Sequence, residues 1–591
     1  MCGIWGVISP DRKDAFGFYM SRAFSSLAHR GPDGKGSFRR GNVLFGHTRL
    51  KVLDMTERAA QPMESPDGQV VLSYNGEVFN FLELKEALVA KGYVFRSDSD
   101  TEVALYAYME WGEGCFQRFN GMFAVVLADY HRGKVIAAVD RFGIKPLYYL
   151  KFKGQIFFAS EMKVFLDLQE FSPRLDPEVL GEVLTYRCLN PGRTLVEGVG
   201  SLEGGNVMTV DMADPTRMKK RPYWELQPQD CSSSYDAAGE ELLCLLKDSL
   251  RLRKVCDVPH GIMLSGGVDS SLLVALDREM NRDTPMTFSV GFDQPAYDER
   301  PYSEFVSKKF GTRHRNYVFS DRDVVEAYRK CVWHLEDPIN HPHTPLLYLI
   351  SREVKKHVTV LLTGEASDEI FAGYSRHRVC RDAVNQGADP VQTVLRSSAL
   401  MAPEVLERLL VDQRCLASLE LRRELIEKAG PLSFLQRLQY YDIKTYLPSL
   451  LMRLDKMTMA ASVESRLPFM DYRLVEFAFS LPDAFKIRNQ STKAILKDVA
   501  MNYFPHDFTH RKKVGFRTPF REWIRNQDYF RQLLFKKASP LDVYVDQGYV
   551  REVGERFFNG EDSFECSDVV WSVINLKLWC ILFMEGEVPV G

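Results

Sequence analysis

The pattern of hydrophobic and polar positions divides the chain into two regions. In the first ~210 residues, short apolar runs alternate with clusters of Gly, Pro, Asn and Asp, which predicts antiparallel strands joined by turns. Apolar residues at helical spacing predict helices over 81–92 and 100–112. We therefore expect a domain of two stacked antiparallel sheets. The clearest predicted strands lie at 42–50, 69–79, 121–130, 133–140 and 155–161.

The second region follows a polar, turn-rich stretch around 226–240. We predict a linker over 216–236, with one domain at 2–215 and another at 237–591. A helix is predicted over 237–253, and short apolar runs then alternate with helical segments, which predicts a parallel sheet in an α/β domain. The expected strands lie within 260–265, 286–292 and 358–364, and beyond residue 385 the chain becomes a helix-rich extension.

Composition argues against several classes of protein. The net charge of −3 gives no electrostatic basis for binding nucleic acid or an anionic membrane. The eleven cysteines contain no CxxC pair, so neither a zinc site nor a disulfide framework is indicated. No signal peptide is predicted, because the first apolar run ends at Ser9 and Pro10, and no uninterrupted apolar run is long enough to span a membrane. We expect a cytoplasmic protein with small-molecule substrates.

The second residue, Cys2, lies directly behind the initiator methionine. It could be an ordinary buried thiol in a first strand, or a nucleophile that becomes the first residue once Met1 is removed. In the second case its own α-amino group, with an ordinary pKa near ~8, can take the proton of the thiol. No histidine partner is then needed.

Residues suited to binding an amino acid follow Cys2 in order. Arg49 could pair with a carboxylate, and Asp100 could accept hydrogen bonds from an ammonium group. Asn75 and the backbone N–H of Gly76 could donate to an oxyanion. Each alone could be a turn residue or a surface charge. Behind Cys2 they favour a nucleophilic site that holds an α-amino acid and stabilises its tetrahedral intermediate.

This region resembles the N-terminal-nucleophile glutaminase domain of the class II glutamine amidotransferases. The segments "RFNGMFAVVLAD" (118–129) and "DRFGIKPLYY" (140–149) narrow the resemblance to the asparagine synthetase family. The resemblance implies a four-layer αββα sandwich, with Cys2 as nucleophile and Asn75 and Gly76 as oxyanion hole. It also implies that glutamine is contacted by Arg49, Leu50, Lys51, Val52, Leu53, Asn75, Gly76, Glu77 and Asp100.

In the second region, "HGIMLSGGVDSSLLVAL" (260–276) combines an apolar strand, a Gly/Ser turn and the start of a helix. A helix N-terminus presents free backbone N–H groups to phosphate oxygens. Asp269 in this turn would repel phosphate unless a cation intervened, which argues for a magnesium ligand. The turn is not a Walker A loop, because no Gly-Lys-Ser/Thr follows. The predicted phosphate contacts are Ser265, Gly266, Gly267, Ser270 and Ser271.

The segment "VTVLLTGEASDEIFAGY" (358–374) repeats this arrangement at the end of another predicted strand. Parallel sheets bind ligands beyond the carboxyl ends of their strands. Asp368 could share a metal with Asp269, and Glu365 could act as a general base on incoming ammonia. A solvated acidic loop is the alternative. Ala366 stands where many relatives have glycine, and its methyl group should be tolerated unless the residue needs a positive φ.

Both motifs resemble the ATP-pyrophosphatase synthetase domain of the same family, as do 453–471, 492–500 and 511–520. The resemblance implies that ATP and Mg²⁺ activate a carboxylate as an acyl-adenylate, and that ammonia reaches it through an internal tunnel. Lys493 would stabilise the transferring phosphate, Glu365 would assist amide formation, and Asp269 and Asp368 would hold Mg²⁺. The implied ATP contacts are Leu264, Ser265, Gly266, Gly267, Val268, Asp269, Ser270, Ser271, Val290, Thr363 and Gly364.

One segment departs from the family pattern. A Thr-Thr-x-Arg sequence near the bound aspartyl group is missing, and the corresponding region reads "LEDPINHPHTPLLYLIS" (335–351). Its His-x-His is a weak sign of a metal and is better interpreted as loop structure or a substrate contact. Without that arginine, aspartate loses an obvious partner for its α-carboxylate.

Aspartate is the predicted acceptor. The alternative is a paralogue that amidates a cell-wall diamino acid, a surface sugar or a natural-product precursor. An enzyme that closes an amide within its own substrate is disfavoured by Cys2 and Glu365, and a non-catalytic storage or regulatory protein by the complete set of site residues. The "RKK" at 511–513 could contact phosphate or form a solvated turn, and a homodimer is possible.

Overall fold

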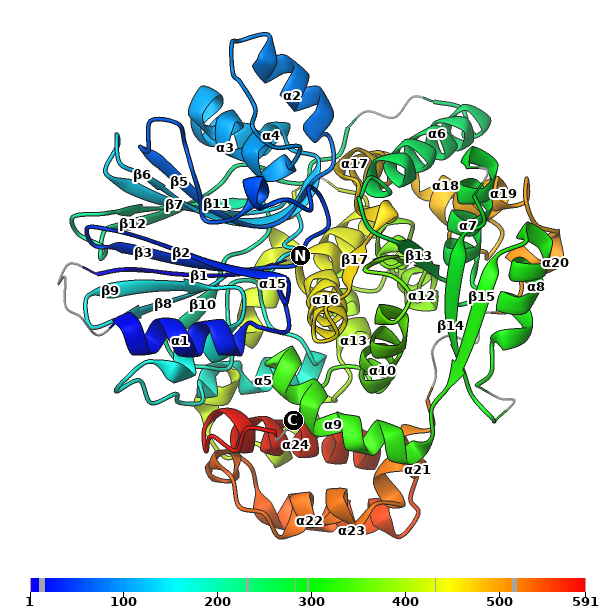
Figure 1. The fold of residues 1–591 in the computed structure, drawn as a ribbon. Coiled ribbons are helices and arrows are strands. Elements are labelled where there is room, and N and C mark those ends of the chain that lie inside the picture. The colour runs from blue at the N-terminus through cyan, green and yellow to red at the C-terminus, as the bar shows by residue number, and fades with distance from the viewer. Residues whose placement is uncertain are drawn as a thin grey trace.

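The computed structural model describes residues 2–9, 16–229, 233–281, 283–294, 297–430, 432–512 and 518–589. Within these residues the chain forms two six-stranded sheets in its N-terminal region and a five-stranded sheet in its C-terminal region. Figure 1 shows the two N-terminal sheets stacked on each other and the third sheet beside them.

Both N-terminal sheets are antiparallel. Their strand orders are β10-β8-β9-β1-β3-β2 and β12-β11-β7-β6-β5-β4. Every strand predicted in this region is present, which confirms that the short apolar runs form the sheets. The strands are β1 (Gly3–Ile8), β2 (Gly34–Arg40), β3 (Val43–Arg49), β4 (Met63–Glu64), β5 (Val70–Val78), β6 (Gly121–Asp129), β7 (Lys134–Val139), β8 (Tyr148–Phe152), β9 (Gln155–Ala159), β10 (Val199–Ser201), β11 (Asn206–Asp211) and β12 (Met218–Pro222).

The inner faces of the two sheets share one apolar core. Ile4, Phe45, Val126 and Phe158 are at most 2% exposed within it, as expected for β-branched and aromatic side chains between two sheets. Figure 1 shows α1 (Phe16–Ser26) outside one sheet, and α2 (Phe81–Val89) and α3 (Asp100–Trp111) outside the other. This arrangement confirms the predicted αββα sandwich.

The C-terminal sheet is parallel, with strand order β15-β14-β13-β16-β17. Because β13 comes first in sequence but lies in the centre, the order of connection reverses beside it. In open parallel sheets such a reversal leaves a ligand-binding crevice at the carboxyl ends of the central strands. The predicted parallel sheet is confirmed. Its strands are β13 (His260–Met263), β14 (Met286–Gly291), β15 (Arg313–Val318), β16 (Val360–Leu362) and β17 (Glu464–Arg466).

Helices surround this sheet and make up most of the chain beyond it. The first of them are α6 (Tyr235–Arg253), α7 (Val268–Met280), α8 (Arg300–Phe310), α9 (Asp321–Leu335), α10 (Thr344–Lys355) and α11 (Ser367–Ile370). Two short helices precede them in the chain, α4 (Cys115–Arg118) beside α3 and α5 (Leu180–Tyr186). The predicted helix-rich extension contains α12 (Ser375–Asn385), α13 (Pro390–Ser398), α14 (Pro403–Leu409), α15 (Leu419–Glu427), α16 (Phe434–Met459), α17 (Tyr472–Ser480), α18 (Asp483–Lys486), α19 (Ala494–Ala500), α20 (His506–Thr509), α21 (Phe520–Arg525), α22 (Asp528–Phe535), α23 (Gln547–Phe558) and α24 (Phe564–Phe583).

The predicted linker, 216–236, is partly structured. Residues 218–222 form β12, which pairs with β11 at the edge of the second sheet. Helix α6 begins at Tyr235, and the Ser234 side chain caps it by accepting from the Ala237 N–H. The positions of the two domain boundaries stay a prediction.

One helix of the described chain, α24, is long and apolar enough to cross a membrane by length and composition. Its most apolar window is 94% buried inside the protein. Trp571, Trp579 and Leu582 are at most 2% exposed and belong to the largest apolar core. A core helix of a folded domain accounts for this composition.

Buried charges join the two regions. Arg30 and Lys145 of the sandwich each donate to Asp455 of α16 at 2.9 Å, and all three side chains are at most 1% exposed. Lys456, the next residue of α16, donates to the Tyr148 hydroxyl of the sandwich at 2.8 Å. Because a buried charge without a partner is costly, these contacts fix the sandwich against α16.

Candidate active sites

The first site surrounds Cys2, which directly precedes β1 and is 7% exposed. Its backbone N–H donates to Asn75 Oδ1 at 2.9 Å. Asn75 lies in β5 and is fully buried, and its Nδ2 has no hydrogen-bond partner among the described residues. An unpaired buried donor costs free energy unless a ligand accepts from it. The fold thus holds an available N–H donor beside the candidate nucleophile, as an oxyanion hole requires.

Gly76, the second predicted oxyanion donor, has a φ of +155°. A Cβ atom there would lie 2.1 Å from the backbone oxygen of Met122 in the neighbouring strand β6. Glycine is the residue that tolerates both this conformation and this close approach. The sequence therefore needs glycine here for a structural reason as well as the predicted chemical one.

Replacing Gly76 with alanine should displace β5 beside Cys2. We expect the rate of glutamine hydrolysis to fall by roughly a hundredfold, the size of effect seen when one oxyanion donor is removed. The matched control is Gly92→Ala, because Gly92 also has a positive φ (+95°) but has open space where the Cβ would lie. Assaying glutaminase activity of both variants tests this, and equal losses would contradict a role for Gly76 in the site.

Arg49 and Leu50 lie beside the Cys2 thiol. The Arg49 guanidinium, 7% exposed as a residue, donates to the backbone oxygens of Thr56 at 2.8 Å and Leu53 at 3.3 Å. Burial raises the pKa of the Cys2 thiol, whereas the Leu50 backbone N–H and Arg49 oppose that shift. Met1, whose removal we predict, lies outside the described residues.

Asp100 and Glu77 are both buried beside β5, at 3% and 5% exposed. Asp100 accepts from the Tyr74 hydroxyl at 2.7 Å and from the Val78 N–H at 2.8 Å. Burial raises the pKa of Asp100 to about 6. Burial also raises the pKa of Glu77, which lies 3.5 Å from Arg466 of β17. The C-terminal domain therefore supplies a cation to the first site, which local sequence patterns did not indicate.

The second site lies at the carboxyl ends of β13 and β16. The Gly/Ser turn closes on itself, because the Gly267 N–H donates to Ser265 Oγ at 3.3 Å and Ser270 Oγ lies 3.1 Å from Ser265 Oγ. Gly266 has a φ of +74°, and a Cβ atom there would lie 2.7 Å from Tyr302. The turn leads directly into α7, so the backbone N–H groups of its first turn face the crevice, as phosphate binding requires.

The other predicted ATP contacts lie around this turn. Leu264 and Thr363 directly follow β13 and β16, and Val290 lies near the end of β14. The Thr363 hydroxyl is buried without a hydrogen-bond partner in the described structure. A Cβ atom on Gly364 would lie 3.0 Å from the Ser270 nitrogen, so this glycine lets the two motifs approach each other.

Lys493 joins the two acidic motifs. Its Nζ lies 2.8 Å from Asp269 Oδ2 and 2.8 Å from Asp368 Oδ1. The Ser367 hydroxyl donates to Asp269 Oδ1 at 3.0 Å and accepts from Lys493 at 3.2 Å. Lys493 has a φ of +52°, a conformation that costs free energy in a residue with a side chain. Residues separated by 224 positions in sequence thus meet in one charged cluster.

The cluster offers oxygen ligands of the kind that magnesium binds. Two carboxylates from different strand ends approach one point, and the Lys493 ammonium group lies within hydrogen-bonding distance of both. Among the described residues no group of three or more His, Cys, Asp and Glu side chains is arranged to hold a metal ion. Two carboxylates fit Mg²⁺, which commonly takes one or two protein carboxylates and completes its shell with substrate phosphates and water.

Glu365 lies in the same loop as Asp368 and faces a different partner. Its Oε1 accepts from Arg453 of α16 at 3.1 Å. Ala366, the next residue, has a φ of +77°. Ala366 therefore has the positive φ at which its methyl group is unfavourable. This left-handed conformation costs roughly 1–2 kcal/mol in a residue other than glycine. Burial raises the pKa of nearby Glu369 to about 8.

Both regions of the chain match known protein families. Residues 241–580, more than half of the chain, match the family model described as asparagine synthase. The chain belongs to the asparagine synthetase family. Residues 1–224 match the model described as a glutamine amidotransferase domain. Because it contains both domains, the chain is a glutamine-dependent ligase that uses ATP to form an amide.

Asparagine synthetases of bacteria match the whole chain. Asparagine synthetase [glutamine-hydrolyzing] 1 of Bacillus subtilis is 30% identical over 99% of this chain and 97% of its own length. A putative asparagine synthetase [glutamine-hydrolyzing] of Mycobacterium bovis is 30% identical over 100% of this chain and 98% of its own length. A solved glutamine phosphoribosylpyrophosphate amidotransferase of B. subtilis matches at 16% identity and a TM-score of 0.29, over 67% of this chain and 79% of its own.

Several residues at the second site of this asparagine synthetase family member were not indicated by sequence patterns. Arg453 contacts Glu365 from 88 positions away. A Cβ atom on Gly373 would lie 2.1 Å from Asp368 Oδ1 and 2.2 Å from Lys493 Cε, so only glycine leaves room for the cluster. Of the basic segment, Arg511 donates to the Gly266 backbone oxygen at 3.1 Å, and Lys513 lies outside the described residues.

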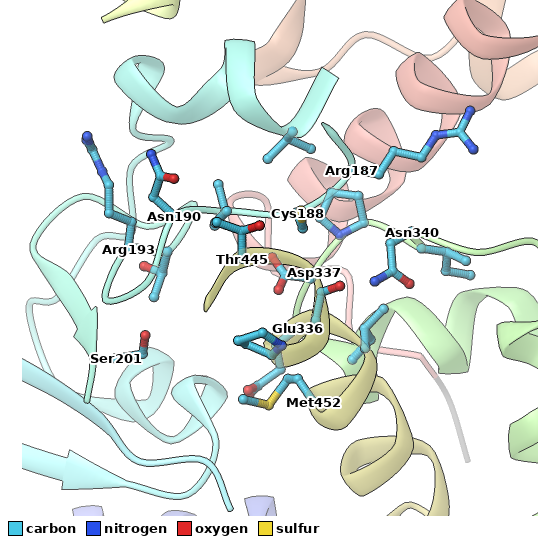
Figure 2. Close-up of a pocket in the computed structure, with 18 of the residues that line it drawn as sticks. Arg187, Cys188, Asn190, Arg193, Ser201, Glu336, Asp337, Asn340, Thr445 and Met452 are labelled. Atoms are coloured by element: carbon cyan, nitrogen blue, oxygen red, sulfur yellow. The ribbon is translucent and has the colours of Figure 1, made fainter. Parts of the chain in front are cut away.

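A cavity of about 120 Å³ is lined by none of the predicted site residues. It is lined by the loops 187–194 and 335–340 and by one face each of α16 and α24. Figure 2 shows the Asp337 side chain in the middle of these lining residues. Burial raises the pKa of Asp337 to about 7. The loop that replaces the Thr-Thr-x-Arg sequence thus lines this cavity with residues 335–340. The same loop carries His343 three residues further along the chain.

Proposed function

We propose that this chain is an asparagine synthetase, which moves the amide nitrogen of glutamine as ammonia to an acyl-adenylate of aspartate. The observation that carries the proposal is the presence of two complete chemical centres in one chain. One centre places Cys2 beside Asn75, whose Oδ1 accepts from the Cys2 N–H and whose Nδ2 has no partner among the described residues. The other places Lys493 between Asp269 and Asp368 at the phosphate turn.

In the first centre the Cys2 thiolate attacks the glutamine amide after Met1 is removed. The new α-amino group takes the thiol proton and later gives a proton to the leaving ammonia. Asn75 Nδ2 and the Gly76 N–H donate to the oxyanion. Arg49, Leu50, Lys51, Val52, Leu53, Glu77 and Asp100 bind the rest of glutamine.

In the second centre the turn at 264–271 holds the ATP phosphates through its backbone N–H groups and serine hydroxyls. When bound to Asp269 and Asp368, Mg²⁺ supplies charge compensation for the pyrophosphate that leaves. Lys493 donates to the phosphate at which the acceptor carboxylate attacks. Glu365 takes a proton from ammonia as it attacks the acyl-adenylate, so that amide forms and AMP leaves.

One apolar core extends from the first centre to the second. It includes Leu50, Met122 and Ile144 on the glutaminase side and Leu264 and Ala366 on the synthetase side. Leu50 is close enough to Cys2 to affect its pKa, and Ala366 is bonded to Glu365. An apolar lining favours neutral ammonia over ammonium, because burying an unpaired charge is costly. This supports the proposed internal tunnel.

The acceptor is tested by measuring pyrophosphate release with ATP, Mg²⁺ and glutamine, and with aspartate beside a panel of other carboxylic acids. Release with aspartate, and asparagine among the products, is the expected result. Release only with a cell-wall diamino acid, a sugar acid or a natural-product precursor would contradict aspartate and support the alternative paralogue.

Three further properties belong to this proposal. The enzyme acts in the cytoplasm on small molecules, without nucleic acid or a membrane as partner, consistent with its net charge of −3. It requires Mg²⁺, which fits the two carboxylates at Lys493. It can form a homodimer, which size-exclusion chromatography at low and high protein concentration would test.

A further inference from the structure

We propose that His343, acting through Arg453, positions the Glu365 carboxylate for the amide-forming step. This inference rests on the role proposed for Glu365 and adds two positioning residues to it. It also gives a function to the His-Pro-His segment that replaces the Thr-Thr-x-Arg sequence in this chain.

The three side chains form a continuous hydrogen-bonded row. Arg453 donates from Nη2 to Glu365 Oε1 at 3.1 Å and from Nη1 to His343 Nε2 at 2.8 Å. The Arg453 side chain is 4% exposed, whereas that of Glu365 is 30% exposed. A buried arginine therefore holds one oxygen of a carboxylate that remains accessible to substrate. A guanidinium with two of its nitrogens bound has little rotational freedom, so it fixes the direction of Glu365.

The contact with Arg453 determines the protonation of His343. A guanidinium can only donate hydrogen bonds, so His343 Nε2 must be the unprotonated acceptor and Nδ1 must carry the proton. Burial, and then the charge of Arg453, lowers the pKa of His343 well below its ordinary value. The imidazole is therefore neutral at the pH at which the enzyme acts and can serve as an acceptor throughout.

The backbone around His343 is anchored to the helix that carries Arg453. At the start of the loop, Glu336 accepts from Lys456, one turn further along α16, at 2.6 Å. At its end the Thr344 hydroxyl donates to the His341 backbone oxygen at 2.7 Å, where α10 begins. The loop and the last turns of α16 thus hold His343 and Arg453 in fixed register.

The row predicts which chemical step depends on it. Lys493 forms ion pairs with Asp269 and Asp368, and these three are the candidate residues for activating the carboxylate. Arg453 instead forms an ion pair with Glu365. Loss of the histidine acceptor should therefore loosen the base of the amide-forming step and leave acyl-adenylate formation in place.

The test compares His343→Leu with His343→Gln. Leucine removes the acceptor, whereas the glutamine side-chain oxygen can still accept from Arg453. For His343→Leu we expect the kcat of amide formation with ammonia to fall at least roughly tenfold, the effect of losing a hydrogen bond to a charged group. Acceptor-dependent exchange of pyrophosphate into ATP should stay within about twofold. His343→Gln should recover most of the amide-forming rate.

Two additional variants separate the possible failures. Glu365→Gln should lose amide formation more severely than His343→Leu while retaining exchange, and an active Glu365→Gln enzyme would refute the role of Glu365 itself. His341→Leu is the matched loop control, because the His341 ring stacks on His343 but has the Tyr446 hydroxyl as its hydrogen-bond partner, whereas Arg453 donates to His343. If Glu365→Gln behaves as expected but His343→Leu keeps full activity, or loses exchange and amide formation equally, the positioning role is overturned. An equal loss in His341→Leu would overturn it as well.

Discussion

Replacing Cys2 with alanine is expected to abolish glutamine-dependent amide synthesis and to leave ammonia-dependent synthesis close to that of the unchanged enzyme. The loss should be at least roughly a thousandfold, because the thiol is the proposed nucleophile, for which no second group can substitute. Ammonia-dependent synthesis needs only the second centre, where Lys493 bridges Asp269 and Asp368. The measurement is the initial rate of amide formation with glutamine and, separately, with an ammonium salt.

A second buried cysteine supplies the control. Cys115 lies in α4 of the same domain and is fully buried, so Cys115→Ala tests the effect of removing a buried thiol without touching the site. It should retain both activities. Loss of ammonia-dependent synthesis in Cys2→Ala would mean that the two centres are not chemically separate.

Replacing Asp269 with asparagine should stop pyrophosphate release while glutamine hydrolysis continues. Asparagine keeps the shape of the side chain but removes the charge that we assign to Mg²⁺ and that Lys493 faces at 2.8 Å. We expect acceptor-dependent pyrophosphate release to fall at least roughly a hundredfold, since a metal-clamped phosphoryl site depends on its charge balance. The measurement follows pyrophosphate and glutamate in parallel, and removing Mg²⁺ with a chelator should reproduce the same pattern in the unchanged enzyme.

Asp277 is the matched control for this change. It lies two turns further along α7, is 2% exposed, and pairs with Lys254 instead of the Asp269 cluster. Asp277→Asn should retain pyrophosphate release even if it lowers stability. Retained release in Asp269→Asn, or equal loss in the two variants, would remove Asp269 from the proposed metal site.

The sandwich and the two motifs could be predicted because their signals are local. Strands such as β6 and β7 are nearly continuous apolar runs between turn residues, and the fold makes them buried neighbours. The Gly/Ser turn and the acidic motif each follow a short buried strand, and parallel strands bring their carboxyl ends together. The meeting of Asp269 with Asp368 follows from that rule.

The contacts that local patterns missed join distant segments. Arg453 reaches Glu365 only because α16 packs beside the end of β16, and nothing near Arg453 in sequence marks that approach. The positive φ of Ala366 is likewise set by the turn into α11 rather than by its own residue type. A sequence pattern can say what a methyl group would cost under each conformation, but not which conformation the turn imposes.

The predicted linker illustrates a different reason. Residues 218–222 read "MKKRP" and are mostly exposed, which resembles a solvated connection. They form β12, the edge strand of its sheet. Edge strands commonly carry lysine, arginine and proline because these residues prevent further strand pairing. Polar composition therefore did not distinguish an edge strand from a linker.

The most direct test of the central claim follows the amide nitrogen itself. The enzyme is incubated with glutamine labelled with ¹⁵N in its amide group, ATP, Mg²⁺ and aspartate, and the products are analysed by mass spectrometry. The proposal predicts ¹⁵N in the side-chain amide of asparagine, with one AMP and one pyrophosphate formed for each amide. Label that appears only as free ammonium, or ADP and phosphate in place of AMP and pyrophosphate, would contradict it.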